Sequence, residues 1–417
     1  MNLRRVVVTG LGAITPLGST VEEFWNSLLN GVSGADMITR FDASLHKTRF
    51  ACEVKDYDAL AYFDRKEVRK LDPYAQYAMI ASDQAIADSG ILTDGIDKNR
   101  VGVIYATGIG GFTSFLNEAV AYGRGDGTPR FNPFFIPKII GDIAAGHISI
   151  KHGFRGANYA TTSACASAGH AIIDAFNYIR LGKADAFVSG GSEAGINPAG
   201  IGGFNSMHAI STRNDDPKSA SRPFDKDRDG FVLGEGGGAV ILEEYEHAKK
   251  RGAKIYAEIV GGGSTADAHH ITSPHPDGLG AKLAMEEALR EARLKPEDID
   301  HINTHGTSTP VGDVAEPKAI LSLFGDHAYK MNLNATKSMH GHLLGAAAAV
   351  ELIATILALT NSVVPPTINH FTDDPLIDNK LNFTFNKAQE RVVNVALSNA
   401  FGFGGHNTSI AVKKIVE

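Results

Sequence analysis

Two segments far apart in the chain share one pattern, and it constrains the fold more than any other feature of the sequence. Residues 159–169 and residues 334–345 both combine small and hydroxyl-bearing residues with glycine, and each runs into a long apolar stretch with helical spacing. Each helix is followed by a strand that ends in small residues. An internal repeat of this kind predicts two similar halves, each contributing a loop that begins a central helix. We therefore expect Cys165 and His342 to face each other at the midline of the molecule.

Strand-like and helix-like stretches alternate along the whole chain. Strands are expected over residues 5–9, 101–106, 186–190, 231–242 and 255–261, and helices over residues 21–29, 73–89, 171–182 and 281–293. This alternation is typical of α/β proteins with largely parallel sheets. At 417 residues, with 43% hydrophobic and 21% charged residues, the chain is long enough for two domains with sizeable cores.

The charge balance and the apolar stretches argue against several classes of protein. There are 40 Lys and Arg against 47 Asp and Glu, a net charge of −7, which gives no global bias toward nucleic acid or an anionic membrane. The N-terminus enters a strand without room for a signal peptide. The most apolar stretch, residues 343–359, is interrupted by Glu351 and is too short to span a bilayer, which predicts a buried helix. Cys52 and Cys165 lie in dissimilar contexts, which argues against a disulfide and for a reducing cytoplasm.

Two further stretches imitate ligand-binding loops but lack a required residue. Residues 10–18 follow the first strand as a dinucleotide-binding loop does, yet Thr15 stands where the fingerprint needs its third glycine, so we expect a strand-to-loop turn. Residues 225–236 begin like a calcium loop but end on Gly236, where a bidentate Glu is required. The sequence therefore predicts neither a dinucleotide site nor a metal site.

Cys165 is the candidate nucleophile. It lies at or just before the first turn of the helix that stops near Gly182, where unpaired backbone N–H groups and the positive end of the helix dipole favour a thiolate. Such a position can lower the thiol pKa from ~8.5 by one to several units. The alternative for a cytosolic cysteine is the role of a small buried hydrophobe, and the residues downstream decide between the two.

Two of the later segments supply partners for such a nucleophile. His305 follows the strand over residues 299–304, and the hydroxyls of Thr307 and Thr309 beside it suit a linear ligand that bears amides. Residues 401–407 form a glycine-rich turn after a buried strand. Its exposed backbone N–H groups suit an oxyanion hole more than a phosphate cradle, because no GK[ST] motif or helix start follows.

The third segment brings a histidine and a buried charge. His342 stands at the start of the apolar helix. Glu351 is a single charge in that helix and must be paired or neutralised. Lys337, a few residues before His342, is its natural partner.

These segments occur in the chain order Cys165, His305, Lys337, His342 and Phe403. As a set they resemble the β-ketoacyl-acyl carrier protein synthases, and they are most similar to the type II elongating condensing enzymes of bacterial fatty-acid synthesis. The resemblance covers essentially the whole chain. It implies an α/β fold of the thiolase-like five-layer α-β-α-β-α type built from two duplicated halves, which we place at residues 1–254 and 255–417. It also implies a homodimer.

The resemblance further implies an activity and a role for each matching residue. Cys165 would carry the acyl chain as a thioester. His305 and His342 would activate malonyl-acyl carrier protein for decarboxylation and bind the thioester oxygen that becomes the enolate. Condensation would give 3-oxoacyl-acyl carrier protein in fatty-acid elongation. Lys337 would support the site in a pair with Glu351.

Phe403 matches the residue that gates access to Cys165 and gives a backbone N–H to the oxyanion hole. The substrate-binding positions implied by the resemblance are Thr307, Thr309, Phe401, Ile109, Phe204 and Glu351. No cofactor and no metal are expected, because the substrates are carried on the phosphopantetheine arm of acyl carrier protein.

A local basic cluster stands out on this acidic chain. Lys66, Arg69 and Lys70 match positions at which the family docks its acidic carrier protein, and such an encounter is steered by charge. His208 stands where some relatives carry an Arg for the same purpose. The alternative is that the cluster is simply a solvated helix end.

Two other functions of the same fold stay open. One is a ketosynthase of a polyketide or polyene pathway, which turnover of saturated acyl-carrier substrates would separate from fatty-acid elongation. The other is a non-catalytic partner subunit that shapes chain length, a role that the presence of Cys165 disfavours.

Overall fold

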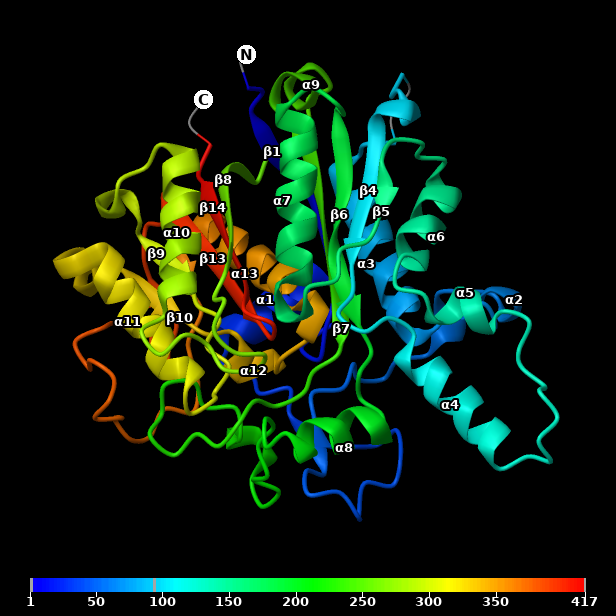
Figure 1. The fold of residues 1–417 in the computed structure, drawn as a ribbon. Coiled ribbons are helices and arrows are strands. Elements are labelled where there is room, and N and C mark those ends of the chain that lie inside the picture. The colour runs from blue at the N-terminus through cyan, green and yellow to red at the C-terminus, as the bar shows by residue number, and fades with distance from the viewer. Residues whose placement is uncertain (1–2, 93–94, 416–417) are drawn as a thin grey trace.

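The computed structural model describes residues 3–92 and 95–415, and it contains a ten-stranded sheet whose two halves have the same internal order (Figure 1). From the centre outward the first half contains β1 (Val6–Ile14), β7 (Gly236–Glu244), β6 (Ala186–Glu193), β4 (Val101–Ala106) and β5 (Asn158–Tyr159). In the matching places the second half contains β8 (Ala257–Ala266), β14 (His406–Lys413), β13 (Val395–Gly402), β9 (His301–Asn303) and β10 (Asn332–Asn334). β1 and β8 pair antiparallel and join the halves. The repeat predicted from the sequence is therefore present in the backbone.

The sheet is mixed, which corrects the expectation of largely parallel sheets. In each half the two outer pairings are parallel, β6–β4–β5 and β13–β9–β10. The inner pairings, β1–β7–β6 and β8–β14–β13, are antiparallel. The short turn at residues 403–405 between β13 and β14 shows one physical reason, because two parallel strands need a much longer crossover.

Helices form three layers around the two halves of the sheet. α3 (Pro73–Ser89) and α6 (Ile143–His152) cover the outer face of the first half, and α10 (Leu279–Ala292) and α11 (Gly312–Phe324) cover the outer face of the second. α7 (Ser167–Arg180) and α13 (Ala347–Asn361) lie between the halves (Figure 1). This is the five-layer α-β-α-β-α order of the thiolase-like fold.

The other elements are short or peripheral. The remaining helices are α1 (Val21–Leu29), α2 (Arg65–Val68), α4 (Phe112–Gly123), α5 (Phe135–Ile139), α8 (Pro198–Ser206), α9 (Tyr245–Lys250) and α12 (Lys337–His340). The short strands are β2 (Asp36–Met37), β3 (Phe50–Ala51), β11 (Val363–Val364) and β12 (Gln389–Glu390). The predicted bounds of α1 and α3 are confirmed, and α3 is fixed at its ends by the side-chain cap of Asp72 and by Gly90 with a φ of 60°.

Gly10 and Gly12 lie inside the first strand and allow close packing instead of forming a turn. β1 continues through Gly10 and Gly12 to Ile14, where the sequence predicts a strand-to-loop turn. A Cβ on Gly10 would lie 2.2 Å from the carbonyl oxygen of Ala85, and one on Gly12 would lie 1.9 Å from that of Ala81. Both carbonyls belong to α3, so the missing side chains let α3 lie directly on the strand backbone.

The two central helices begin in the same way. α7 follows the 3₁₀ turn η3 (Ala164–Ala166), and α13 follows the 3₁₀ turn η7 (Leu344–Ala346). The first residue of each turn is left-handed, with a φ of 50° at Ala164 and 47° at Leu344. Cys165 in η3 therefore occupies the place that Gly345 occupies in η7.

The apolar helix α13 belongs to the core. Among the described residues one stretch, Leu344–Asn361, is long and apolar enough to cross a membrane, and 89% of its 18 residues are buried inside the protein. The prediction of a buried helix is confirmed, but the expectation that the stretch is too short to span a bilayer is wrong, because its length and composition are sufficient. The side chains of α13 and α7 share one hydrophobic cluster with both halves of the sheet.

Candidate active site

Cys165 lies in the sharp turn directly before α7. The left-handed Ala164 bends the chain there, and residues of that conformation with a side chain mark strained turns at functional sites. The Ser163 N–H donates to Ser167 Oγ at 2.8 Å and stabilises the turn by a hydrogen bond within it. Gly402 of β13 packs closely against the turn, since a Cβ on Gly402 would lie 2.9 Å from the Cys165 amide nitrogen. Both halves of the molecule therefore hold the thiol in place.

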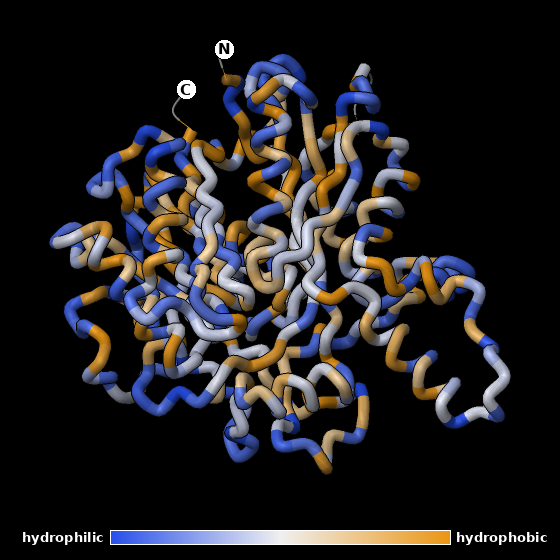
Figure 2. Tube along the Cα trace, in the orientation of Figure 1, coloured by the Kyte–Doolittle hydropathy of each residue, from blue (hydrophilic) through white to orange (hydrophobic). Residues whose placement is uncertain are grey.

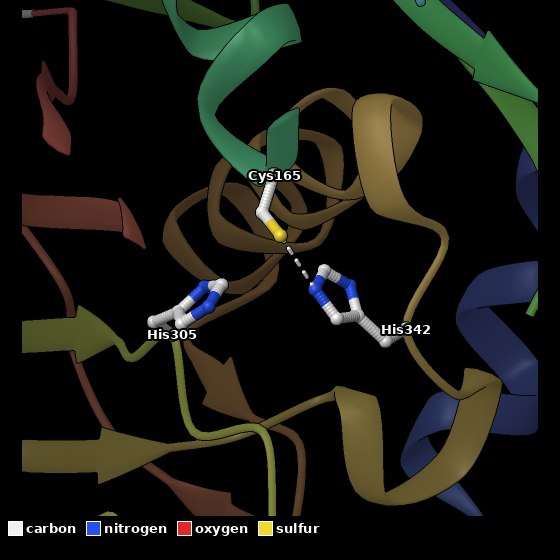
Figure 3. A group of neighbouring side chains, drawn as sticks. All are labelled: Cys165, His305 and His342. Carbon is white, nitrogen blue, oxygen red and sulfur yellow. Dashed lines mark hydrogen bonds between the residues drawn. The ribbon is translucent and has the colours of Figure 1, made fainter. Parts of the chain in front are cut away.

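His342 reaches Cys165 from the second half. Its Nε2 lies 3.0 Å from the Cys165 Sγ (Figure 3). The backbone fixes the ring, because the Leu344 N–H donates to Nδ1 at 3.3 Å and the His342 N–H donates to the Val232 carbonyl at 2.7 Å. When Nδ1 accepts a hydrogen bond, the proton of a neutral imidazole is on Nε2. His342 therefore presents an N–H to the sulfur.

His305 completes the group. The ring centroids of His305 and His342 are 5.5 Å apart at an interplanar angle of 84°, and one nitrogen of each ring and the Cys165 Sγ lie within 4.8 Å of one another. Figure 3 shows the three side chains pointing toward a common centre. Glu316 of α11 holds the turn after β9, because its carboxylate accepts from the N–H groups of His305 at 2.9 Å and Gly306 at 3.0 Å.

Burial keeps both imidazoles neutral. It lowers the pKa of His305 and of His342 well below 6.5, and the positive charge of Lys337 lowers both pKa values further. Each ring can then offer an N–H without carrying a charge. Such a donor stabilises a developing enolate oxygen and does not protonate the neighbouring carbanion.

The thiol itself corrects the expectation of a lowered pKa. Burial raises the pKa of Cys165 to about 11, although the charge of Lys337 and the backbone N–H groups of Phe403 and Cys165 act in the opposite direction. The side chain lies in the interior, where the loss of hydration outweighs these opposing contributions. The resting thiol is therefore protonated at neutral pH, and the converging N–H groups stabilise the sulfur as its proton leaves.

Lys337 and Glu351 form the buried ion pair that the sequence predicts. The Lys337 Nζ lies 2.5 Å from the Glu351 Oε1, and the two side chains are 1% and 0% exposed. Neither residue lines the cavity around Cys165. The structure thus places Glu351 against Lys337 and not among the substrate contacts that the resemblance implies. Lys337 acts on the site through its charge.

Replacing Lys337 by methionine is expected to lower the free energy of unfolding by about 3–5 kcal/mol, because the buried Glu351 carboxylate loses its cation. Urea denaturation measures this loss. The double variant Lys337→Met/Glu351→Leu removes both charges and should recover most of the stability. A single variant as stable as the unchanged protein contradicts the importance of the pair.

A cavity of about 670 Å³ surrounds the three reactive side chains. It is lined by these expected site residues: Cys165, His305, His342, Phe403, Thr307, Thr309, Phe401, Ile109 and Phe204. The hydroxyl oxygens of Thr307 and Thr309 lie 2.9 Å apart on one wall. A concave, largely apolar cavity with a few convergent polar groups suits an acyl chain on a linear polar arm.

The basic cluster lies apart from this cavity. Lys66, Arg69 and Lys70 are exposed on or directly after α2, which Figure 1 places at the periphery of the molecule. None of the three lines the cavity, whereas His208 does. The structure therefore brings the catalytic candidates together and leaves the docking candidates on the surface.

By distance alone, Cys165, His305 and His342 could also hold a metal ion. The hydrogen bond from the Leu344 N–H to His342 Nδ1 argues against this use, because it leaves Nε2 protonated where a metal would need its lone pair. The arrangement fits a nucleophile with two N–H donors better than a metal centre.

Sequence reasoning missed two buried carboxylates, Glu316 and Glu193. Glu193, at the end of β6, accepts from the backbone N–H groups of Gly108, Ile109 and Gly345. Both carboxylates bind backbone donors, which any residue type supplies, so their partners leave no pattern in the sequence. The usable signal was that Glu193 is a lone charge in a stretch of small and apolar residues, and such a charge requires partners.

The chain matches two family models in succession. The model of the β-ketoacyl synthase N-terminal domain matches residues 3–248, and that of the C-terminal domain matches residues 256–371. The 3-oxoacyl-acyl-carrier-protein synthase 2 of Synechocystis sp. is 49% identical over 411 residues, which are 99% of this chain and 98% of that protein. The protein of the same name from Coxiella burnetii is 46% identical over the full length of both.

Solved structures agree with this match. A β-ketoacyl synthase from Burkholderia phymatum superposes with a TM-score of 0.91 at 35% identity, covering 99% of this chain and 100% of that one. A type II polyketide ketosynthase, solved in complex with its acyl-carrier protein, gives the same values. With Cys165 and two histidines gathered in one cavity of this fold, the chain belongs to the β-ketoacyl synthase family.

Proposed function

We propose that this protein is a condensing enzyme that elongates acyl chains on acyl carrier protein in fatty-acid synthesis. It takes an acyl chain onto Cys165, decarboxylates malonyl-acyl carrier protein, and joins the two to give 3-oxoacyl-acyl carrier protein. The observation that carries the proposal is the contact of 3.0 Å between His342 Nε2 and Cys165 Sγ, with His305 beside it in one buried cavity. The names of the full-length relatives support the substrate class.

The first step transfers the acyl chain. The Cys165 sulfur attacks the acyl thioester carbonyl, the thiol proton leaves, and the pantetheine thiol is released, so one thioester replaces another. The backbone N–H groups of Cys165 and Phe403 both lower the pKa of the Cys165 thiol, which supports the proposal that they also donate to the negative oxygen of the intermediate.

The second step makes and uses a carbanion. The malonyl group loses CO₂, and the electron pair of the broken C–C bond becomes an enolate whose oxygen accepts from the N–H groups of His305 and His342. The enolate carbon then attacks the Cys165 thioester, a C–C bond forms, and the thiolate leaves and regains a proton. No electrons pass to or from a third species, so no redox cofactor is required, and the two imidazole N–H donors take the enolate charge that a Lewis acid would otherwise hold. We therefore propose that the reaction needs neither a cofactor nor a metal.

The test is turnover with defined substrates. Incubation with a saturated acyl-carrier donor should place the acyl mass on the peptide that contains Cys165. Addition of malonyl-acyl carrier protein should then release a 3-oxoacyl product. Acyl transfer without condensation would overturn the elongating assignment. Failure of saturated donors, with turnover of 3-oxo-bearing chains instead, would favour a polyketide ketosynthase.

We also propose that Lys66, Arg69 and Lys70 dock the acidic carrier protein. Their exposure and their distance from the cavity leave them free for a partner. Reversal of all three charges to Glu is expected to raise the apparent KM for acyl-carrier substrates about tenfold or more, with kcat unchanged, because repulsion slows the encounter. Steady-state kinetics measure both constants. An acyl-pantetheine donor is the control, and its KM should not change. If the variant and the unchanged protein have the same KM for the carrier-linked donor, the docking role is contradicted.

The pair α4 and α5 bears the surface on which we propose homodimer formation. Figure 2 shows hydrophobic residues along these helices, which project from the body of the protein. The large hydrophobic residues exposed on or beside these helices are Phe115, Val120, Tyr122, Phe131, Phe134, Ile136 and Ile140. The sheet ends in the short edge strand β5. Apolar patches and open sheet edges are typical sites of subunit contact.

Light scattering after gel filtration should accordingly give a mass near twice the 44.3 kDa of the chain. Ile136→Lys places a charge at the most exposed position of the patch and should shift the mass toward the monomer. Leu376→Lys, at an exposed position outside the patch, is the control. An unchanged protein that elutes as a monomer contradicts the proposal.

The location, the division into two halves and the choice of partners complete the proposal. We propose a cytoplasmic location, supported by the two free cysteines and the acyl-carrier chemistry. We propose residues 1–254 and 255–417 as the two units, since β8, the first strand of the second half, begins at Ala257. The net charge of −7 offers no support for a nucleic-acid or membrane partner.

A further inference from the structure

Glu193 is a buried carboxylate that accepts four hydrogen bonds. Its Oε2 accepts from the N–H groups of Gly108 at 2.7 Å and Gly345 at 3.0 Å. Its Oε1 accepts from the Thr107 hydroxyl at 3.1 Å and the Ile109 N–H at 3.2 Å. Burial raises the pKa of Glu193 to about 7, the four donors oppose that rise, and no cation is among the main contributions. The carboxylate is thus held by backbone dipoles and one hydroxyl.

The donors come from two segments that meet at the site. Thr107, Gly108 and Ile109 form the loop after β4, and Ile109 lines the cavity. Gly345 lies in η7, directly after the residue whose N–H fixes the His342 ring. The segments pack backbone to backbone, because a Cβ on Gly345 would lie 2.1 Å from the Gly108 nitrogen. Glu193 is the side chain that ties them together.

The two amides that flank Leu344 have separate tasks. The Leu344 N–H donates to His342 Nδ1 and so sets the N–H on Nε2. The Gly345 N–H donates to Glu193. Leu344 itself has a φ of 47°, a strained conformation that persists only where its surroundings enforce it. Release of the Gly345 amide would let Leu344 relax, and its own N–H would turn away from His342.

We propose that Glu193 is a positioning residue that holds His342 and the acyl-pocket residue Ile109 in register with each other. The inference rests on the proposed condensing function and deepens it. Glu193 does not line the cavity or touch the reacting atoms, and it acts through Gly345 and the loop after β4. Its carboxylate thus connects the loop of Ile109, which faces the acyl chain, to His342, whose N–H stabilises the enolate.

The donor set explains why a carboxylate is needed. Each oxygen faces two donors, and an ionised carboxylate has acceptor sites for all four. Glutamine has the same shape, but its NH₂ group donates and cannot accept from a backbone N–H. With the NH₂ group on the Oε2 side the bonds from Gly108 and Gly345 are lost; on the Oε1 side the Ile109 bond is lost and the Thr107 hydroxyl must turn to accept. Glu193→Gln therefore weakens the clamp and keeps the volume.

Glu243→Gln is the matched control. Glu243 is also a fully buried carboxylate, and it pairs with Ala186 at the opposite end of the β6–β7 ladder, far from the cavity. Its partners are Thr9, His247 and Arg251. This substitution should reduce the melting temperature as a buried charge loss does, without altering the site.

The experiment compares both full-length variants with the unchanged protein in two assays. One measures acylation of Cys165 by short and long saturated acyl-carrier donors, and the other measures CO₂ release from malonyl-acyl carrier protein. For Glu193→Gln we expect kcat for CO₂ release to fall about 10- to 100-fold with KM unchanged, and the long-to-short acylation ratio to shift. Glu243→Gln should keep both kcat and the ratio.

The outcomes separate this inference from the proposed function. If the unchanged protein forms no 3-oxoacyl product, the proposed function fails. If it does, and Glu193→Gln keeps both kcat and the acyl ratio, the positioning role fails alone. The positioning role is also overturned if both variants lose kcat for CO₂ release in proportion to the fall in their melting temperatures. Should Glu193→Gln not fold, Thr107→Val removes one donor to Oε1, and it should shift the acyl ratio with a smaller loss of kcat; an unchanged ratio contradicts the clamp.

Discussion

Replacement of Cys165 by alanine is expected to abolish formation of the 3-oxoacyl product while CO₂ release from malonyl-acyl carrier protein continues. Without the sulfur the acyl chain has no attachment point in the cavity, and condensation should fall on the order of 10⁴-fold or more. In the proposed mechanism decarboxylation uses a different part of the site, because the N–H groups of His305 and His342, which lie beside the sulfur, take the enolate charge. Mass spectrometry of the carrier-bound product and radiometric measurement of CO₂ follow the two reactions separately.

Cys52→Ala is the matched control for this prediction. Cys52 is the other cysteine of the chain, is 1% exposed, and has a thiol pKa that burial raises. It does not line the cavity, so its removal should leave the acyl mass on the Cys165 peptide and the condensation rate unchanged. A Cys165→Ala protein that condenses normally would contradict the role of Cys165 as nucleophile. One that loses CO₂ release together with condensation would contradict the assignment of decarboxylation to His305 and His342 alone.

The two similar halves and the cluster of reactive side chains could be predicted from the sequence, because particular residue types mark both of them. The repeated loop-and-helix pattern around Cys165 and His342 anticipated that the two residues meet, and the structure joins them at 3.0 Å. The lone charge of Glu351 in an apolar helix required a partner, and Lys337 provides it. In each case a side chain with a definite chemical need is itself the signal.

The parts that could not be predicted depend on the backbone and on burial. Glu193 accepts from backbone N–H groups 85 and 152 residues away in the chain. Because nearly every residue type has a backbone N–H, the sequence does not show which ones Glu193 will meet. The mixed sheet depends on which strands pair across the centre. The helix-start argument for Cys165 gave the wrong direction of the pKa shift, because the sequence shows the helix but not the depth at which the thiol is buried.

Alanine at either histidine is expected to slow CO₂ release about 10²–10³-fold, because each substitution removes one N–H donor to the enolate oxygen. The two variants should differ in the first step. His342 contacts the sulfur, so His342→Ala should also slow acylation of Cys165, whereas His305→Ala should acylate at a rate near that of the unchanged protein. Asparagine is the matched replacement at each position, since its side chain keeps a neutral N–H donor and should recover part of the CO₂ release. Equal loss of acylation in both alanine variants would contradict the division of labour.

The pH profile of CO₂ release tests the charge state on which this argument depends. Burial lowers the pKa of both rings well below 6.5, so each ring takes up a second proton only at a pH far below that value. Between about pH 6 and pH 8 the histidines should therefore stay neutral, and the rate should show no step that disappears in the asparagine variants. A step near pH 6.5 that both asparagine variants abolish would mean that the rings titrate as solvated imidazoles do. An imidazolium would then face the carbanion and could protonate it, and the pair could not act as the neutral donors that condensation requires.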